Sequence, residues 1–161
     1  MEFNILAILV AAISALVVGF VWYNPKVFGN AWMQAADITE EKIKSGNMGK
    51  IFALALLFAF FLAFYMQVLV IHQMGAWSMI GGEKTAETLP SFQAFMDDYG
   101  TAFRTFKHGA LHGVLAGIFI ALPIIGTNAL FERKSAKYIL INSGYWIVTL
   151  AIMGGIICGW V

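Results

Sequence analysis

Charged residues, cysteine and proline are scarce in this sequence. Only 12% of its 161 residues are charged and 60% are hydrophobic, whereas a soluble domain carries roughly 25% charged residues. The single cysteine, Cys158, can form no disulfide within the chain. The formal net charge is +1, so no strongly basic surface is expected to attract nucleic acid, and no zinc-finger or nucleic-acid motif occurs. This composition is typical of an integral membrane protein.

Long apolar blocks take the place of the missing charges. A helix needs about 20 apolar residues to cross a hydrocarbon core of roughly 30 Å. The first block follows a leader that has Glu2 but no lysine or arginine, and its apolar run exceeds that of a secretory signal, so we expect it to be retained. The sequence predicts an all-α integral membrane four-helix bundle, a single transmembrane domain over residues 1–161. The predicted spans cover residues 3–23, 51–73, 109–130 and 138–160.

The connecting segments predict surface helices and an orientation. Residues 91–107 alternate aromatic and polar side chains with helical periodicity, which predicts an amphipathic helix, whereas residues 75–90 are expected to form a loop. In the first loop, Asp37 is expected to cap a short helix. The first and third loops hold seven lysine and arginine residues against three on the other side. The positive-inside rule then places these loops in the cytoplasm, and both termini and the amphipathic helix outside it.

Small residues recur at every fourth position on three of the predicted spans. Such stripes let helices approach closely in lipid. Pro123 interrupts the third span and predicts a bend there. A four-helix bundle can bury some stripes internally, and any surplus indicates a subunit interface. The leading hypothesis is therefore a bundle that forms homo-oligomers or joins other membrane proteins. The expected helix-packing residues are Ala11, Ala15, Gly19, Gly109, Gly113, Gly117, Gly155 and Gly159.

All three histidines are predicted to lie near one membrane boundary. His72 closes the second predicted span, and the i,i+4 spacing of His108 and His112 puts both rings on one face of the third. Three neutral imidazoles could bind zinc or copper and leave a fourth position open, or they could relay protons. Alternatively, His108 is an interfacial residue and His112 a hydrogen-bonded residue of the bundle. The metal hypothesis predicts a metal-dependent membrane enzyme, although no nucleophile–base pair, phosphate loop or cofactor fingerprint occurs.

Polar residues gather near the opposite boundary, where they form a predicted cytoplasmic polar cluster. Asn128 and Glu132 share one face of the third span. The cluster could bridge and cap helices, or it could form a gate or a site for a headgroup or an ion. A pathway from the histidines to this cluster along the third span is the alternative hypothesis, a small oligomeric transporter or channel. The members of the cluster are Asn24, Asn128, Glu132, Arg133 and Asn142.

Several segments resemble one protein family. They are WYNPKVFGNAW after the first span, EEKIKSGNMGKIF before the second, KHGALHGVLAG and NALFERK in the third, and INSGYWIVTLAIMGGIICGW in the fourth. The chain resembles an uncharacterised bacterial family of small four-helix membrane proteins. The resemblance implies four spans in the bacterial cytoplasmic membrane and implies no particular activity. Its most specific residues are Trp22, Tyr23, Pro25, Phe28, Gly29 and Trp32.

Overall fold

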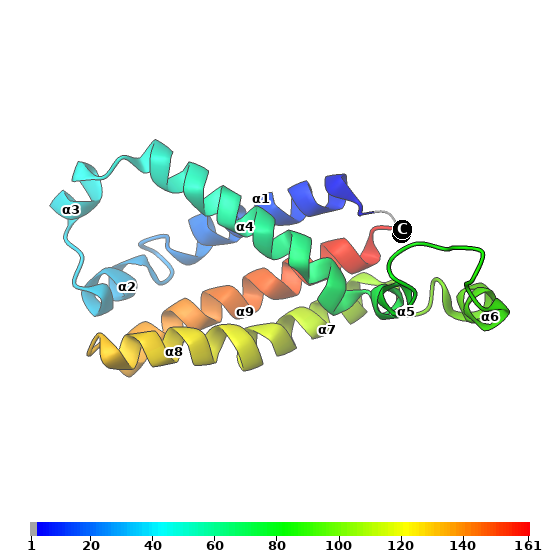
Figure 1. Cartoon of the computed structure of the whole chain (residues 1–161). Coiled ribbons are helices and arrows are strands. Elements are labelled where there is room, and N and C mark those ends of the chain that lie inside the picture. Colours follow the sequence, from blue (N-terminus) through cyan, green and yellow to red (C-terminus); the bar gives the residue numbers. More distant parts are fainter. Residues whose placement is uncertain (1–2) are drawn as a thin grey trace.

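The computed structural model describes residues 3–161, in which every regular element is a helix and no β-strand occurs. Figure 1 shows long helices side by side, with short helices gathered at both ends. The helices, in chain order, are α1 (Ile5–Trp22), α2 (Gly29–Ala36), α3 (Glu40–Ser45), α4 (Met48–Val70), α5 (Gln73–Met79), α6 (Pro90–Tyr99), α7 (Phe106–Ala116), η1 (Gly117–Ala121), α8 (Leu122–Phe131) and α9 (Ala136–Gly159).

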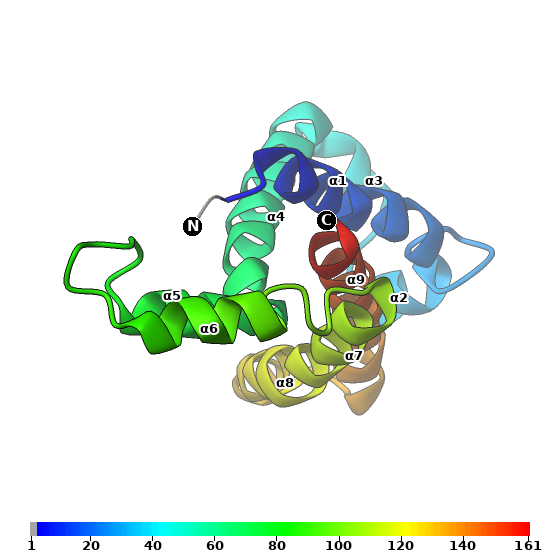
Figure 2. The same cartoon turned by 90° about the vertical axis from the view of Figure 1, so that its right-hand side faces the viewer.

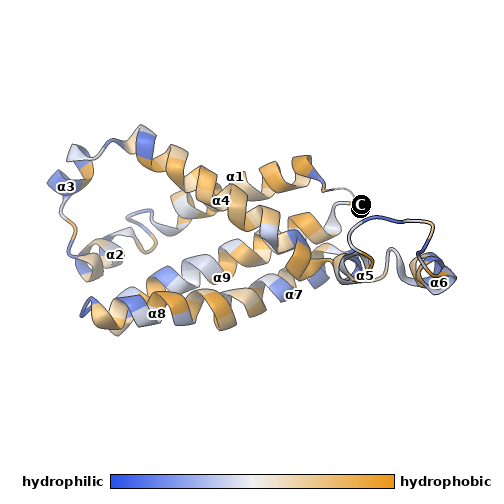
Figure 3. Ribbon diagram, viewed as in Figure 1, coloured by the Kyte–Doolittle hydropathy of each residue, from blue (hydrophilic) through white to orange (hydrophobic). Residues whose placement is uncertain are grey.

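Four helical segments are long and apolar enough to cross a membrane. They are α1, α4, the continuous segment Phe106–Phe131 that joins α7, η1 and α8, and α9. Figure 3 shows hydrophobic residues along most of α1 and α4, while hydrophilic residues gather in α3 and between α5 and α6. The chain is therefore an all-α, multi-pass membrane protein.

Helix α9 is the central element of the bundle. It packs against α1, α4, α7, η1 and α8, and Figure 2 shows it enclosed by the other spans. Its Met153, Ile157 and Cys158 are almost fully buried together with Ile8 of α1 and Met66 of α4. Helices α2 and α3 lie at one end of the bundle, and α5 and α6 lie at the other end with the C-terminus (Figure 1).

The segment between the second and third spans differs from its prediction. The predicted loop over residues 75–90 contains most of α5, and α6 ends at Tyr99 instead of continuing to residue 107. The chain turns after Gly100, where Phe103 has a positive φ of 62°. Thr105 then caps a new helix, because its hydroxyl accepts a hydrogen bond from the backbone N–H of His108. The stretch 91–107 thus divides into α6, a turn and the start of α7.

The first loop also contains more structure than its sequence predicts. Helix α2 precedes the predicted short helix, and Asp37 ends α2 in the left-handed conformation instead of capping α3. The cap of α3 is Thr39, whose hydroxyl accepts from the backbone N–H of Lys42. Gly29 begins α2 directly against Tyr23 and Asn24, where a β-carbon would overlap their backbone atoms. This close approach sets the start of α2 against the turn that follows α1, and α2 packs against α9.

The third span contains an irregular turn near Pro123. The π-helical turn η1, Gly117–Ala121, lies immediately before α8, in which Pro123 occupies the first turn. Proline lacks a backbone donor and its ring conflicts with the carbonyl four residues earlier. Such π-turns re-route the hydrogen bonds of a helix by one residue. The interruption that Pro123 predicts therefore takes the form of a π-turn within a continuous span.

Candidate metal site

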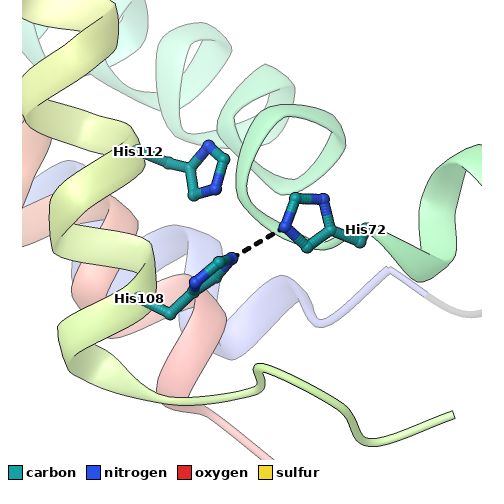
Figure 4. A group of neighbouring side chains, drawn as sticks. All are labelled: His72, His108 and His112. Atoms are coloured by element: carbon teal, nitrogen blue, oxygen red, sulfur yellow. Dashed lines mark hydrogen bonds between the residues drawn. The ribbon is translucent and has the colours of Figure 1, made fainter. Parts of the chain in front are cut away.

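The three histidines come together at the end of the bundle that holds α5 and α6. One ligand atom of each ring lies within 4.8 Å of those of the other two. The Nε2 atoms of His72 and His108 lie 2.8 Å apart, and the ring of His112 lies 5.0 and 4.5 Å from those of His72 and His108, centroid to centroid. Figure 4 shows the three rings directed toward one common space. The juxtaposition that the sequence suggests is present in the fold.

His72 owes its position to a turn between two helices. Helix α4 ends at Val70, Ile71 is extended, and His72 is the residue that precedes α5. The neighbouring Gln73 fixes this turn, because its buried side-chain Nε2 donates to the carbonyl oxygens of Tyr99 and Ala102 at 2.6 and 3.0 Å. His72 therefore sits on a short connection tied to the segment that leads into α7, rather than at the end of a span.

His108 and His112 lie on the first two turns of α7. The Thr105 cap fixes the start of this helix. The i,i+4 spacing then directs both rings toward His72. Phe103, just before the helix, packs its ring 5.1 Å from that of His108 and 6.0 Å from that of His72. One aromatic ring thus supports both histidines that share the short nitrogen–nitrogen contact.

Cys158 and Arg104 connect the histidine-bearing segments to α9, a role that their sequence positions do not reveal. The buried Cys158 Sγ lies 3.3 Å from the carbonyl oxygen of Val70 and 3.4 Å from that of Phe103. A thiol has a single hydrogen, so the two carbonyls share it. Arg104 donates to the carbonyl oxygens of Cys158 and Trp160 at 3.0 and 2.8 Å. The end of α9 therefore holds the segments that carry His72 and His108 side by side.

The three rings could hold a metal ion after their nitrogen atoms move. One of the two facing Nε2 atoms donates a hydrogen and the other accepts it. Nitrogen ligands at 2.0–2.1 Å from a tetrahedral zinc lie about 3.3 Å apart. Binding would therefore widen the contact between His72 and His108 by about half an ångström and displace the shared proton. It would also draw together ligand atoms that lie as much as 4.8 Å apart. His72 is exposed, so the cluster is open to the surroundings.

The expected helix-packing residues all lie at contacts within the chain. Ala11 and Ala15 are buried in the core. A β-carbon on Gly109 or Gly113 would overlap backbone atoms of α9, and one on Gly117 would lie 2.6 Å from the Cα of Ile147. On α9, Gly155 and Gly159 face Phe106, whereas Gly19 leaves ordinary contact distance to Tyr145. Most of these small residues therefore face another helix of the same chain, while space remains beside Gly19.

The side chains of the predicted cytoplasmic polar cluster form no hydrogen bond with one another within residues 3–161. Asn142 accepts a hydrogen bond from the Tyr23 hydroxyl at 3.0 Å, while Asn24 accepts from the backbone N–H of Lys26. Asn128, Glu132 and Arg133 are exposed, and their side chains form no hydrogen bond or ion pair within residues 3–161. The sequence places these residues at similar depth but does not determine their direction around the helices.

The segment that carries the family resemblance joins the end of α1 to α9. Trp22 Nε1 donates to the carbonyl oxygen of Ile141 at 3.0 Å. The Phe28 ring lies 4.6 Å from that of Trp22, and the Trp32 ring lies 5.2 Å from that of Tyr23. Burial raises the pKa of the Tyr23 hydroxyl, with smaller effects from Tyr145 and Tyr138, so the group stays protonated and donates to Asn142.

An ion pair at the same end of the molecule was not predicted from the sequence. Lys134, in the turn between α8 and α9, donates to a carboxylate oxygen of Asp37 at 2.8 Å and to the carbonyl oxygen of Ala36 at 3.1 Å. The hydrogen bond from Lys134, and then its charge, lowers the pKa of Asp37. The same hydrogen bond raises the pKa of Lys134. The pair fastens the end of α2 to the turn that precedes α9.

Comparison with known proteins identifies a family for the chain but no activity. No curated protein matches it, and no solved structure does. One family model, described as a protein of unknown function (DUF1761), matches residues 6–158, nearly the whole chain. The chain therefore belongs to the DUF1761 family of proteins of unknown function.

Proposed function

We propose that this protein is a metal-binding membrane protein whose ligands are His72, His108 and His112. The observation that carries the proposal is their convergence from two segments of the chain, with one ligand atom from each ring within 4.8 Å of the others. Neutral imidazole is a preferred ligand of zinc and copper. Three such ligands leave a fourth position for water or another small molecule, as in catalytic rather than structural zinc sites.

The surroundings of the three rings leave several ring nitrogens without a bond to another protein group. Within residues 3–161, the one hydrogen bond of these rings is the contact between His72 and His108. No carboxylate joins the three rings in the cluster. Their remaining nitrogens are therefore available to a cation.

The open position of the cluster supports exchange of the metal over permanent retention. Histidine ligands of tightly held metals usually donate their second nitrogen to a carboxylate or carbonyl, which fixes the ring. The described residues supply no such partner to these three rings, and His72 is exposed. We therefore propose that Zn²⁺ or Cu²⁺ binds reversibly.

The distribution of basic residues supports an orientation for the site. The loop between α1 and α4 and the turn between α8 and α9 carry most of the lysine and arginine residues. The positive-inside rule favours a cytoplasmic position for these two loops. The histidines and both termini then lie on the extracytoplasmic side. The bacterial inner membrane, which the family resemblance implies, is part of this proposal. Self-association, a transport pathway along the third span and a metal-dependent reaction stay predictions.

Metal content of the purified chain tests the proposal. The chain should carry no polyhistidine tag, because such a tag binds the same metals. After incubation with zinc or copper and removal of the excess, we expect about one metal ion per wild-type chain and almost none in the His108→Ala and His112→Ala variants. Lys107→Ala, an exposed neighbour on α7, serves as the matched control and should bind as the wild type does.

Circular dichroism and elution volume should show that the alanine variants remain folded, since His108 and His112 are only partly buried. A wild-type chain without bound metal would contradict the proposal. So would folded histidine variants that retain as much metal as Lys107→Ala.

A further inference from the structure

A second site lies at the opposite end of the bundle, between α1 and α4. A groove of about 760 Å³ opens there, beside the segment that holds α2 and α3. Figure 1 shows α1 and α4 diverging toward this end, with α2 and α3 connecting them. Ligand pockets typically have volumes of roughly 300–1,000 Å³, so the groove is large enough for a bound molecule.

Small residues on both helices make the groove hollow. Ala15 and Gly19 line it from α1, and Ala55 and Ala59 line it from α4, each pair at i,i+4 spacing. A β-carbon on Gly19 would lie 3.7 Å from the Tyr145 ring, which is ordinary contact. The small residues at this end therefore leave room between the helices, whereas Gly109 and Gly113 bring their helix against α9.

The lining is almost entirely apolar and has one charged residue. Phe20 and Phe52 belong to the two walls, and their rings contact each other at 5.5 Å. The charged lining residue is Lys42 of α3, which is exposed, and no acidic side chain lines the groove. Within residues 3–161, the ammonium group of Lys42 is therefore the one charged group that lines this apolar groove.

The position of the groove determines what can fill it. Its walls are segments of α1 and α4, both membrane-spanning helices, and Phe20, Phe52 and Phe58 of its lining are exposed on the outside of the bundle. The surroundings of such a surface in a membrane are lipid chains rather than water. Lysine near the membrane surface attracts the headgroups of anionic lipids.

We propose that this groove binds one anionic glycerophospholipid of the adjoining leaflet. One acyl chain lies along the apolar lining beside Phe20, Phe52 and Ala55, and the phosphate lies beside Lys42. Lysine suits this partner because its ammonium group pairs with phosphate as a point charge without demanding a fixed geometry. The bound lipid fills the space between α1 and α4 at this end of the bundle and does not involve the histidines.

Native mass spectrometry of the full chain in mild detergent tests this inference. The probes are phosphatidylglycerol and phosphatidylcholine with identical acyl chains, added to delipidated protein. We expect one phosphatidylglycerol per chain, bound in preference to phosphatidylcholine. Because one basic residue near a membrane surface contributes about a five-fold gain in lipid affinity, Lys42→Gln should weaken phosphatidylglycerol binding roughly five-fold. The matched control, Lys44→Gln on the same helix, changes an exposed lysine outside the groove and should bind as the wild type does.

A second pair of variants tests the groove itself. Ala55→Trp fills it and should abolish binding of both lipids, whereas Ala53→Trp places the same side chain on an exposed part of α4 outside the groove and should leave binding intact. If Lys42→Gln and Lys44→Gln weaken phosphatidylglycerol binding equally, the attraction is a general effect of positive charge, and the inference is overturned. Absence of a retained lipid in the wild type would overturn it as well. If Ala55→Trp does not fold, the two lysine variants still decide the question.

Discussion

Gly109 of α7 and Gly154 of α9 face each other so closely that a β-carbon on either residue would overlap the other's carbonyl group. Only glycine permits this approach of two helix backbones. The contact lies one residue from His108 and four residues from Cys158, so the same packing that joins α7 to α9 also positions the histidine cluster. The stability of this helix pair and the geometry of the site are therefore linked.

The first prediction concerns the glycines of the third span. Gly113→Ala should destabilise the chain by about 1–3 kcal/mol, because the new methyl group would overlap the backbone of Leu150 and lie 2.7 Å from the Cα of Ala151. A backbone cannot move aside as a flexible side chain can. Thermal unfolding in mild detergent measures the change.

Gly126→Ala is the matched control for this prediction, since it makes the same substitution in the same span. Its β-carbon would meet only the Ile139 side chain, at 3.8 Å. Because alanine favours a helix over glycine by about 1 kcal/mol, this variant should be at least as stable as the wild type. Equal stability of Gly113→Ala and Gly126→Ala would show that the α7–α9 contact is looser than described.

The second prediction concerns Tyr23, at the end of α1. Tyr23→Phe removes the hydrogen bond to Asn142 Oδ1 and should cost about 1 kcal/mol, because the partner oxygen loses its donor in a partly buried position. Tyr65→Phe makes the same change at an exposed position on α4 whose hydroxyl forms no hydrogen bond within residues 3–161. The Tyr65→Phe control should unfold at the same temperature as the wild type. If the two variants unfold at the same temperature, the Tyr23 hydroxyl does not contribute to stability.

The third prediction concerns pH and the pair of Asp37 and Lys134. The pKa of Asp37 lies below its ordinary value of 3.8 because Lys134 donates to the carboxylate. The stability that the pair contributes is therefore present above pH 3.8 and is lost as the pH falls through the lower folded-state pKa. The pKa of Lys134 is raised above 10.5, so on the alkaline side the contribution is full below pH 10.5 and is lost as the pH rises through the higher folded-state value.

Melting temperatures of the wild type and Asp37→Asn, measured as a function of pH, test in which pH range the ion pair stabilises the fold. Asparagine tolerates the left-handed conformation of this position, so the variant removes the charge and keeps the turn. Between pH 3.8 and pH 10.5 the wild type should be slightly more stable than the variant. Below pH 3.8 the melting temperatures of the two proteins should converge. A difference that persists unchanged into strong acid would contradict the assignment. The effect should be small, because the Asp37 side chain is 80% exposed.

The sequence predicts the spans well because their signal is local. Apolar runs of the required length define α1, α4, the third span and α9, and the i,i+4 spacing of His108 and His112 is a property of one helix. The approach of His72 depends on the turn after Val70 and on the bonds of Gln73 to Tyr99 and Ala102. Those contacts join residues far apart in the chain, and no local pattern specifies them.

Local patterns also fail to identify which helix or side chain a residue will contact. Glycines at every fourth position predict a close helix contact, but they do not name the partner, which is α9 for Gly109 and Gly113. Depth in the membrane follows from position along a span, whereas direction around the helix depends on tertiary packing. Asn128 and Glu132 are exposed and form no side-chain hydrogen bond with Asn142, and the ion pair of Asp37 with Lys134 could be found only in the fold.

X-ray absorption at the zinc edge tests whether the three histidines coordinate a metal ion. The sample is the untagged wild-type chain in mild detergent with one equivalent of zinc, after removal of unbound metal. We expect three imidazole nitrogens at about 2.0–2.1 Å and one further light ligand. The imidazole scattering should be lost in a folded His72→Ala, His108→Ala double variant. A zinc ion surrounded by oxygen ligands alone, or a spectrum that the double variant leaves unchanged, would contradict a metal site built from His72, His108 and His112.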